Sequence, residues 1–86
     1  MKSFRNKQFH QMYARLPTFV QKQVDAAYQL FRTNPYHPSL HFKQIRSDTP
    51  VYSARVGIGY RALGIWKGDI IVWYWIGSHA DYDKQY

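Results

Sequence analysis

The first third of the chain has the hydrophobic spacing of two amphipathic helices. In residues 4–15, one apolar stripe is formed by Phe9, Met12, Tyr13 and Leu16. In residues 18–33, a second stripe is formed by Val20, Val24, Ala27 and Phe31. Pro17 separates the two segments, because the residue before a proline is pushed out of the helical conformation. Asn34-Pro35 ends the second one, so we predict a tight helical hairpin.

From residue 42 onward the pattern is typical of strands. A short mixed segment, 42–46, precedes an alternating segment, 51–58. Residues 60–66 and 70–76 follow after brief glycine-containing turns, and the last segment is a run of seven apolar or aromatic residues. Strands joined by such short turns pair antiparallel. We therefore predict an α+β fold, with a two-helix hairpin packed on one face of a twisted, mainly antiparallel sheet of about four strands.

The strand at residues 70–76 raises the question of what covers the second face of the sheet. Strict alternation places Ile70, Val72, Tyr74 and Ile76 on one side, and Ile71, Trp73 and Trp75 on the other. Two helices have enough apolar surface for one face only, so we expect the face with the tryptophans to be partly open. An open face of this kind binds a partner, unless residues 78–86 fold over it.

Length and composition limit the class of protein. Eighty-six residues make one domain, which we assign to residues 1–86. The chain has no cysteine, which excludes a disulfide framework and a thiolate metal site and is typical of a reducing compartment, so we expect a cytoplasmic location. The basic N-terminus lacks the apolar segment of a signal peptide. The longest apolar run is about a third of the ~20 residues that cross a bilayer, so we expect no membrane partner.

The charge of the chain indicates an anionic partner. Twelve Lys and Arg against five Asp and Glu give a net charge of +7, which favours nucleic acid or an acidic protein. The aromatic content favours RNA or single strands, because rings stack on bases while cations meet phosphates; a small domain also uses rings to fill its core. His37 and His41 are spaced as a helical metal pair, but Pro38 lies between them. We therefore expect no metal and no cofactor.

Two arginines are predicted to lie side by side in the sheet. Arg55 is in the middle of a strand, and Arg61 follows the turn that joins this strand to the next. Two guanidinium groups at close range repel each other unless an anion lies between them, and a phosphate suits that place. Alternatively, each arginine pairs with Asp48, Asp81 or Asp83, or extends into water.

The polar residues after the last strand add groups that transfer protons. His79 and Tyr82 lie on the same side if residues 78–84 are helical, and Asp81 either orients the histidine or only begins the helical turn. This set suits metal-independent cleavage of RNA. The ribose 2′-OH attacks the adjacent phosphorus, arginines stabilise the added negative charge, and His or Tyr moves the protons. The sequence contains no Ser/His/Asp order, glycine-rich phosphate loop or carboxylate pair that favours another reaction.

Three short motifs occur in a characteristic order and spacing. They are Val51-Tyr52-Ser53-Ala54-Arg55-Val56-Gly57, Gly59-Tyr60-Arg61-Ala62-Leu63 and Gly77-Ser78-His79-Ala80-Asp81-Tyr82. Together they resemble the RelE/ParE superfamily of toxins from bacterial type II toxin–antitoxin modules, over nearly the whole chain. The resemblance implies a β-α-α-β-β-β domain, whose first strand is Met1–Phe4. It also implies an antitoxin that wraps the toxin and holds it inactive.

The resemblance also implies roles for individual residues. Nuclease members of the superfamily cut mRNA, usually in the ribosomal A site, and leave a 2′,3′-cyclic phosphate. Arg61 matches the arginine of the Tyr-Arg motif that contacts the scissile phosphate, and Arg55 matches a basic residue one strand earlier. His79 and Tyr82 match the region that supplies the acid, base or stacking residue. Lys43 is a looser match to a basic residue near the sheet edge.

The sequence therefore predicts a toxin that acts as a ribosome-dependent mRNA endoribonuclease. The expected catalytic residues are Arg61, His79, Tyr82 and Arg55, and the expected RNA contacts are Lys43, Arg46 and Trp75. The expected partners are a cognate antitoxin, mRNA and the ribosome. Two alternatives stay open: a ParE-type toxin that inhibits DNA gyrase without cutting RNA, and an interaction protein whose open face receives an acidic peptide.

Overall fold

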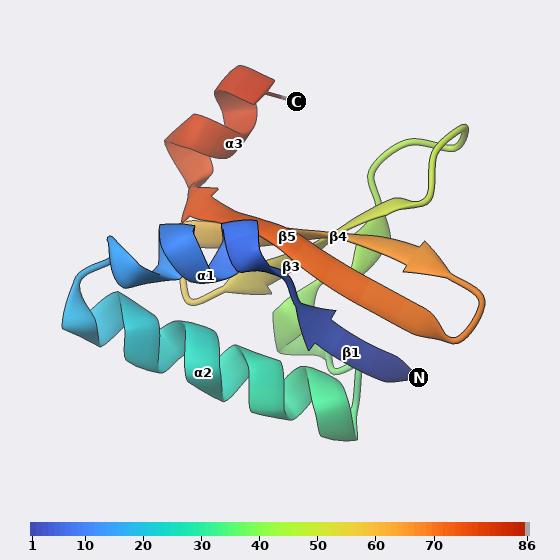
Figure 1. Ribbon diagram of the computed structural model, residues 1–86, viewed down its shortest axis with the longest axis horizontal. Coiled ribbons are helices and arrows are strands. Elements are labelled where there is room, and N and C mark those ends of the chain that lie inside the picture. The colour runs from blue at the N-terminus through green and yellow to red at the C-terminus, as the bar shows by residue number, and fades with distance from the viewer. Residues whose placement is uncertain (86) are drawn as a thin grey trace.

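The chain forms one five-stranded sheet with helices on both sides (Figure 1). The computed structural model describes residues 1–85, and the side chains of residues 1–84. The elements in chain order are β1 (Lys2–Arg5), α1 (Lys7–Ala14), α2 (Thr18–Thr33), the 3₁₀ helix η1 (Pro38–Leu40), β2 (Lys43–Gln44), β3 (Val51–Val56), β4 (Tyr60–Lys67), β5 (Ile70–Ser78) and α3 (His79–Gln85). The strand order is β1-β5-β4-β3-β2, in which β1 pairs parallel with β5 and all other pairs are antiparallel.

The helical hairpin covers one face of the sheet, as predicted. In Figure 1, α2 lies below the sheet and α3 rises above it. The core between the hairpin and the sheet contains Phe9 of α1, three residues of α2 and the inward side chains of β3, β4 and β5. Trp73 is part of this core. The centre of its ring lies 5.1 Å from the centre of the Phe31 ring, which it meets edge-on, and its indole N–H donates to Ser3 Oγ at 3.1 Å. Among the described helices, none has both the length and the apolar character needed to span a membrane.

The first strand agrees with the strand over Met1–Phe4 that the resemblance implied, and it corrects the start of the first helix. Periodicity predicted a helix over residues 4–15, but β1 is extended, and Asn6 caps α1 by accepting a hydrogen bond from the Phe9 N–H at 2.9 Å. Asn6 also donates its own N–H to the Trp73 carbonyl of β5 at 3.0 Å. Four residues are too few to show a period, so this strand is defined by its pairing with β5. The sheet therefore has five strands instead of about four.

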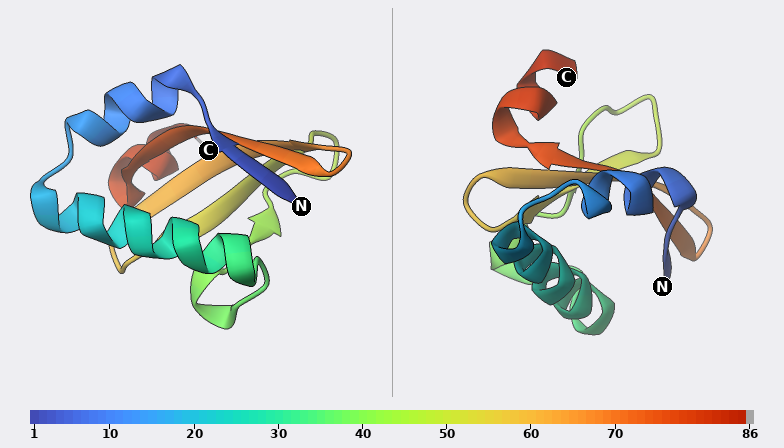
Figure 2. Two further views of the ribbon diagram at one scale, coloured as in Figure 1. Left: turned by 60° about the horizontal axis from the view of Figure 1, so that its bottom comes forward. Right: turned by 60° about the vertical axis from the view of Figure 1, so that its left-hand side comes forward.

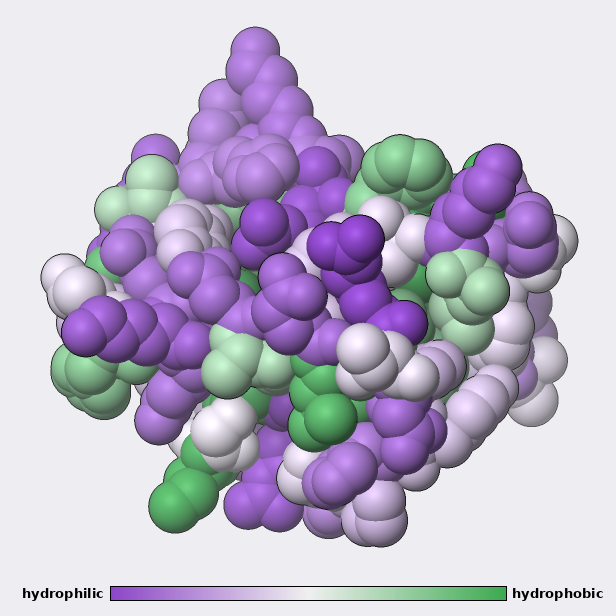
Figure 3. Space-filling model, turned by 90° about the horizontal axis from the view of Figure 1, so that it is seen from below, coloured by the Kyte–Doolittle hydropathy of each residue, from purple (hydrophilic) through white to green (hydrophobic). Residues whose placement is uncertain are grey.

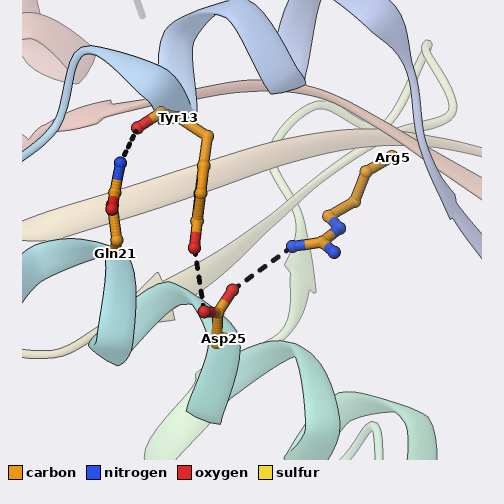
Figure 4. A network of polar contacts seen from close by, with 4 residues as sticks. All are labelled: Arg5, Tyr13, Gln21 and Asp25. Atoms are coloured by element: carbon orange, nitrogen blue, oxygen red, sulfur yellow. Dashed lines mark hydrogen bonds and ion pairs between the residues drawn. The ribbon is translucent and has the colours of Figure 1, made fainter. Parts of the chain in front are cut away.

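A polar network joins β1, α1 and α2 (Figure 4). The Tyr13 hydroxyl donates to Asp25 Oδ2 at 2.8 Å, and Arg5 Nη1 lies 3.5 Å from Asp25 Oδ1. Gln21 donates its amide to the Tyr13 carbonyl at 3.0 Å, and the Arg5 guanidinium lies 4.4 Å from the centre of the Tyr28 ring. The hydrogen bond to Asp25 raises the pKa of Tyr13, and burial and the carboxylate charge raise it further. These contacts fix the angle between the hairpin and the first strand.

One extra residue in β5 changes which side chains share a face. Tyr74 is a β-bulge: the residues on either side of it, Trp73 and Trp75, pair with the adjacent residues Gly64 and Leu63 of β4. The β5 side chains toward the helices are Ile71, Trp73 and Ile76, and those directed away include Val72 and Trp75. The prediction that Trp73 and Trp75 share an open face is therefore wrong, because strict alternation takes no account of an inserted residue.

We call the sheet face directed away from α1 and α2 the open face. Helix α3 rises from one end of this face, and residues 45–50 between β2 and β3 rise from the other end (Figures 1 and 2). The strand register arranges its side chains in rows. From the α3 end, the rows are Arg61 and Arg55; then Trp75, Leu63, Ser53 and Lys43; then Phe4, Val72, Ile65 and Val51; and finally Lys2, Ile70 and Lys67.

Candidate active site

The junction of β5 and α3 is fixed by hydrogen bonds on both sides. Ser78, the last residue of β5, pairs with Tyr60, and its hydroxyl accepts from the Asp81 N–H at 3.1 Å in the first turn of α3. The His79 N–H donates to the Gly59 carbonyl, in the turn between β3 and β4, at 2.8 Å. As a result, α3 begins at a defined position beside the first residues of β4.

Arg61, His79 and Tyr82 form one cluster at this junction. Arg61 Nε donates to His79 Nδ1 at 3.4 Å. The guanidinium carbon lies 5.3 Å from the centre of the Tyr82 ring, within the range of a cation–π contact. The rings of His79 and Tyr82 are 6.1 Å apart on the same side of α3. The structure thus brings together three of the four residues that the sequence predicted to be catalytic.

The contact with Arg61 indicates which tautomer the neutral His79 imidazole adopts. Nδ1 needs a free lone pair to accept from Arg61 Nε, so this geometry requires the His79 proton on Nε2. Nε2 faces Asp83 Oδ2 at 3.7 Å. The carboxylate beside His79 is therefore Asp83, which was expected only as a possible partner of the arginines, and not Asp81. The spacing of four residues on one helix is the signal that identifies Asp83.

Arg61 has one nitrogen that makes no hydrogen bond. Its Nη1 atom is buried and has no partner among the described atoms. Within residues 1–84, neither Arg61 nor Arg55 forms an ion pair with a carboxylate, so the expected alternative of pairing with an aspartate is wrong for both. An unpartnered buried N–H costs about 1–3 kcal/mol, and more when it is charged. An acceptor that reaches this nitrogen would recover that cost.

Arg55 lies opposite Arg61 in the sheet, but its side chain is engaged elsewhere. Arg55 Nε donates to the Gly57 carbonyl at 3.1 Å. The side chain lines an open hollow of about 490 Å³ together with Gln23 and Leu30 of α2. The short strand β2 pairs only with the first part of β3, so Arg55 stands at an open sheet edge. Its predicted catalytic role stays a prediction.

Trp75 lies next to the cluster, against the backbone of Gly77. It lies on the open face, yet only 5% of its surface is exposed. A Cβ atom built on Gly77 would lie 2.7 Å from two carbons of the indole, and Gly77 is the register partner of Arg61. The ring therefore lies in the space that a side chain at position 77 would take. Its expected contact with RNA bases stays a prediction.

Lys43 and Arg46 lie farther from the cluster. Lys43 is exposed on β2 and pairs with Ser53, which pairs with Leu63 of β4. Strand spacing and rise place Lys43 about 12 Å from Arg61. Arg46 is exposed in the segment 45–50, at the far end of the open face from α3 (Figure 1). Both residues extend the basic surface without joining the cluster.

The charged strand residues of the open face are all cations. They are Lys2, Lys43, Arg61 and Lys67; Arg55 starts from the same face, but its side chain lines the hollow beside α2. All five acidic residues of the chain lie in helices, turns or loops: Asp25, Asp48, Asp69, Asp81 and Asp83. Asp48, Asp81 and Asp83 lie in the two segments that rise at the ends of the open face, so its strands carry cations between acidic ends. Among the side chains described, no group of three or more histidines and carboxylates comes together as metal ligands.

Several solved structures share this fold. The chain is similar to a chain of the RelB–RelE antitoxin–toxin complex from Methanococcus jannaschii, with 19% identity over 96% of this chain and 98% of that chain, and a TM-score of 0.75. A YoeB/ParE toxin from Agrobacterium tumefaciens is 12% identical over 92% and 99%, with a TM-score of 0.68. The RelBE2 toxin–antitoxin complex from Mycobacterium tuberculosis is 21% identical over 93% and 92%, with a TM-score of 0.59. The fold is therefore that of RelE/ParE toxins.

The sequence itself assigns the family. Residues 19–84 match the profile of the ParE-like toxin domain. The chain therefore belongs to the ParE-like toxin family, within the RelE/ParE superfamily. A search of curated proteins found no sequence match.

Proposed function

We propose that this protein is the toxin of a toxin–antitoxin module and that it cleaves mRNA on the ribosome without a metal ion. The observation that carries the proposal is the cluster of Arg61, His79 and Tyr82 on an open, basic sheet face. Membership of the ParE-like toxin family supports the role as a toxin. Two of the similar structures are antitoxin–toxin complexes, which supports a cognate antitoxin as the protein partner.

The proposed reaction uses the ribose 2′-oxygen as the nucleophile. The bond from the 2′-oxygen to phosphorus forms while the bond from phosphorus to the 5′-oxygen breaks, which leaves a 2′,3′-cyclic phosphate and a 5′-hydroxyl. Arg61 stabilises the extra negative charge on the phosphorane. His79 and Tyr82 share the two proton transfers, one as base and the other as acid. Arg55 and Lys43 contact the RNA near the cleaved bond, and Arg46 contacts it farther along the open face. Trp75 is 5% exposed and reaches a base only through the part of its ring that stays accessible.

Two substitutions in the cluster test the ribonuclease. Arg61→Ala and His79→Ala should each lower mRNA cleavage by at least about 100-fold, because each removes charge stabilisation or proton transfer. The measurement is inducible expression, with mRNA 5′ ends mapped on and off ribosomes and growth followed in parallel. Arg15→Ala and His10→Ala change the same residue types at exposed positions of the α1 segment and should keep full activity. Full cleavage and full growth inhibition by both cluster variants would exclude the mechanism.

The match to a ParE-like domain favours a second candidate, inhibition of DNA gyrase. A gyrase inhibitor would cause double-strand breaks and SOS induction while mRNA stays intact. It would also tolerate His79→Ala, because no proton transfer is required. The same expression experiment separates the two candidates when DNA breaks are measured beside mRNA ends.

A further inference from the structure

A hollow lies at the end of the sheet that is far from α3. The segment 45–50 and the turn between β4 and β5 form its rim, and Figure 1 shows both at the same end of the molecule. The open hollow has a volume of about 370 Å³, and its walls include Tyr52 of β3 and Trp66 of β4. Trp66 is five residues from Arg61 on β4, or about 17 Å. The hollow is therefore separate from the Arg61 cluster.

Hydrogen bonds hold the walls of this hollow in place. The Trp66 indole N–H donates to the Gly68 carbonyl at 2.9 Å, and the Trp66 backbone N–H donates to the Pro50 carbonyl at 2.9 Å. Gln44 donates its amide to the Thr49 carbonyl at 2.6 Å, which closes the loop between β2 and β3. A ligand would therefore meet walls that are already formed, so little ordering opposes its binding.

The groups that line the hollow suit a cation. Tyr52 and Trp66 supply aromatic rings, whose centres are 5.0 Å apart. Asp48 supplies an exposed carboxylate that forms no ion pair within residues 1–84. Thr49 Oγ1 is buried and has no hydrogen-bond partner among the described atoms. Aromatic faces attract cations, and a carboxylate and a hydroxyl oxygen accept hydrogen bonds from them.

The hollow differs in charge from the rest of the molecule. The chain has a net charge of +7, and Figure 3 shows a largely hydrophilic surface on the α2 side, where the apolar patches are separate. Among the described residues that line the hollow, none is a lysine or arginine, and Asp48 is the one charged residue. Arg46 and Lys67 lie near in the chain but do not line it. A phosphate would find no cation there, and a metal ion only one carboxylate, so an organic cation fits best.

The molecule already holds one guanidinium group between groups of this kind. Arg5 Nη1 lies 3.5 Å from the carboxylate of Asp25. The Arg5 guanidinium carbon lies 4.4 Å from the centre of the Tyr28 ring and 5.9 Å from that of Tyr13. The hollow offers the same combination of a carboxylate, a phenol and a second ring. A planar guanidinium stacks on a ring while its N–H groups donate to a carboxylate, which a compact ammonium cannot do.

We propose that the hollow binds a guanidinium group, carried either by free arginine or by an arginine side chain of a peptide. The guanidinium lies against the rings of Tyr52 and Trp66 and donates to Asp48, with Thr49 Oγ1 as a further acceptor. The site uses no residue of the Arg61 cluster, so it is independent of the proposed function.

The test compares two ligands of the same shape. Nα-acetyl-arginine amide carries the guanidinium, and Nα-acetyl-citrulline amide has an uncharged urea in its place. Each is titrated into the isotope-labelled full chain while the indole N–H signals are followed by NMR. Trp73 and Trp75 are only 3% and 5% exposed, so the signal of Trp66 should move most. We expect a Kd of about 1–10 mM for the arginine amide and binding at least about fivefold weaker for the citrulline amide.

Two variants separate contact with the ligand from the general field of the protein. Asp48→Asn should raise the Kd for the arginine amide about three- to tenfold, because it removes the charge that the guanidinium meets. Asp69→Asn is the matched control, since it removes the same charge from the neighbouring β4–β5 turn without lining the hollow, and it should change the Kd less than about twofold. The dispersion of the NMR signals verifies that each variant is folded.

Free arginine, titrated beside the arginine amide, identifies the source of the guanidinium. Tighter binding of the free amino acid supports a metabolite as the ligand, and tighter binding of the amide supports a peptide. Equal Kd values for the arginine and citrulline amides would show that the charge is not recognised, and the site would be disproved. An equal rise of the Kd in both aspartate variants, or a Trp66 signal that does not move, would overturn it as well.

Discussion

At Gly77 the lack of a side chain allows Trp75 to lie beneath the catalytic candidates. The space for a Cβ atom at this position is filled by the indole, at 2.7 Å from two of its carbons. Carbon atoms in contact are normally about 3.5–4.0 Å apart, so any side chain at position 77 must displace the ring. Gly77 pairs with Arg61, and a displaced indole would therefore disturb the guanidinium and its contact with Tyr82.

Gly77→Ala should accordingly destabilise the protein and impair the cluster. We expect a loss of about 1–3 kcal/mol in the free energy of unfolding, which is the usual cost of overpacking, together with reduced mRNA cleavage. Gly59→Ala is the matched control, because a Cβ built there meets nothing within 4 Å. Urea unfolding and the cleavage assay measure both effects. Equal stability of the two variants would show that the indole moves aside freely.

At the scale of elements, sequence periodicity predicted the long segments and missed features that depend on pairing. The helix predicted over 18–33 is α2 (Thr18–Thr33), and the strand predicted over 70–76 is β5 without its last two residues. Periodicity missed the four-residue strand β1, which only the resemblance implied, and the bulge at Tyr74, because both are defined by the neighbouring strand and not by a local period.

The same limit applies to the candidate site. A tight hairpin predicted that Arg61 lies beside Arg55, and a spacing of three residues on a helix predicted that His79 lies beside Tyr82, because both are local features. The contact between Arg61 and His79 joins residues 18 apart and was expected from the chemistry and the resemblance. The orientation of Arg55 depends on where β2 ends, and the burial of Trp75 depends on the bulge and on Gly77. Neither is visible in the sequence around the residue concerned.

The contact between Tyr13 and Asp25 predicts a pH-dependent link between α1 and α2. The pKa of Tyr13 is raised from 10.0, chiefly by the hydrogen bond to Asp25. The folded state therefore favours the protonated phenol, so its contribution to stability is complete below pH 10.0 and is lost as the pH rises through the folded-state pKa. Tyr13→Phe should lower the free energy of unfolding by about 1 kcal/mol near neutral pH.

Urea unfolding at neutral pH and near pH 11 checks this link, since the difference between wild type and Tyr13→Phe should shrink at the higher pH. Tyr36→Phe serves as the control, because Tyr36 is 65% exposed and should alter stability little at either pH. A difference for Tyr13→Phe that is the same at both pH values would mean that packing of the ring, and not the hydrogen bond, joins the two helices.

At the scale of the whole molecule, the position of the positive charge matters more than its total. The net charge is +7, and a uniformly basic protein would bind RNA through any of its faces. The structure instead places the strand cations Lys2, Lys43, Arg61 and Lys67 on the open face, with no acidic strand residue among them. Each cation that meets a phosphate on a single strand adds about 0.7 to the slope of log Kd against log salt concentration.

Lys43→Gln and Lys22→Gln make the same change of charge on opposite sides of the molecule, since Lys43 lies on the open face and Lys22 is exposed on α2. We expect Lys43→Gln to lower the salt slope for a short single-stranded RNA by about 0.7, and Lys22→Gln to leave it unchanged. The binding is measured in the His79→Ala background, so that the RNA is not cut. An equal decrease of the salt slope in both variants would mean that RNA binding depends on the total charge of the molecule. The open face would then not be the RNA-binding surface.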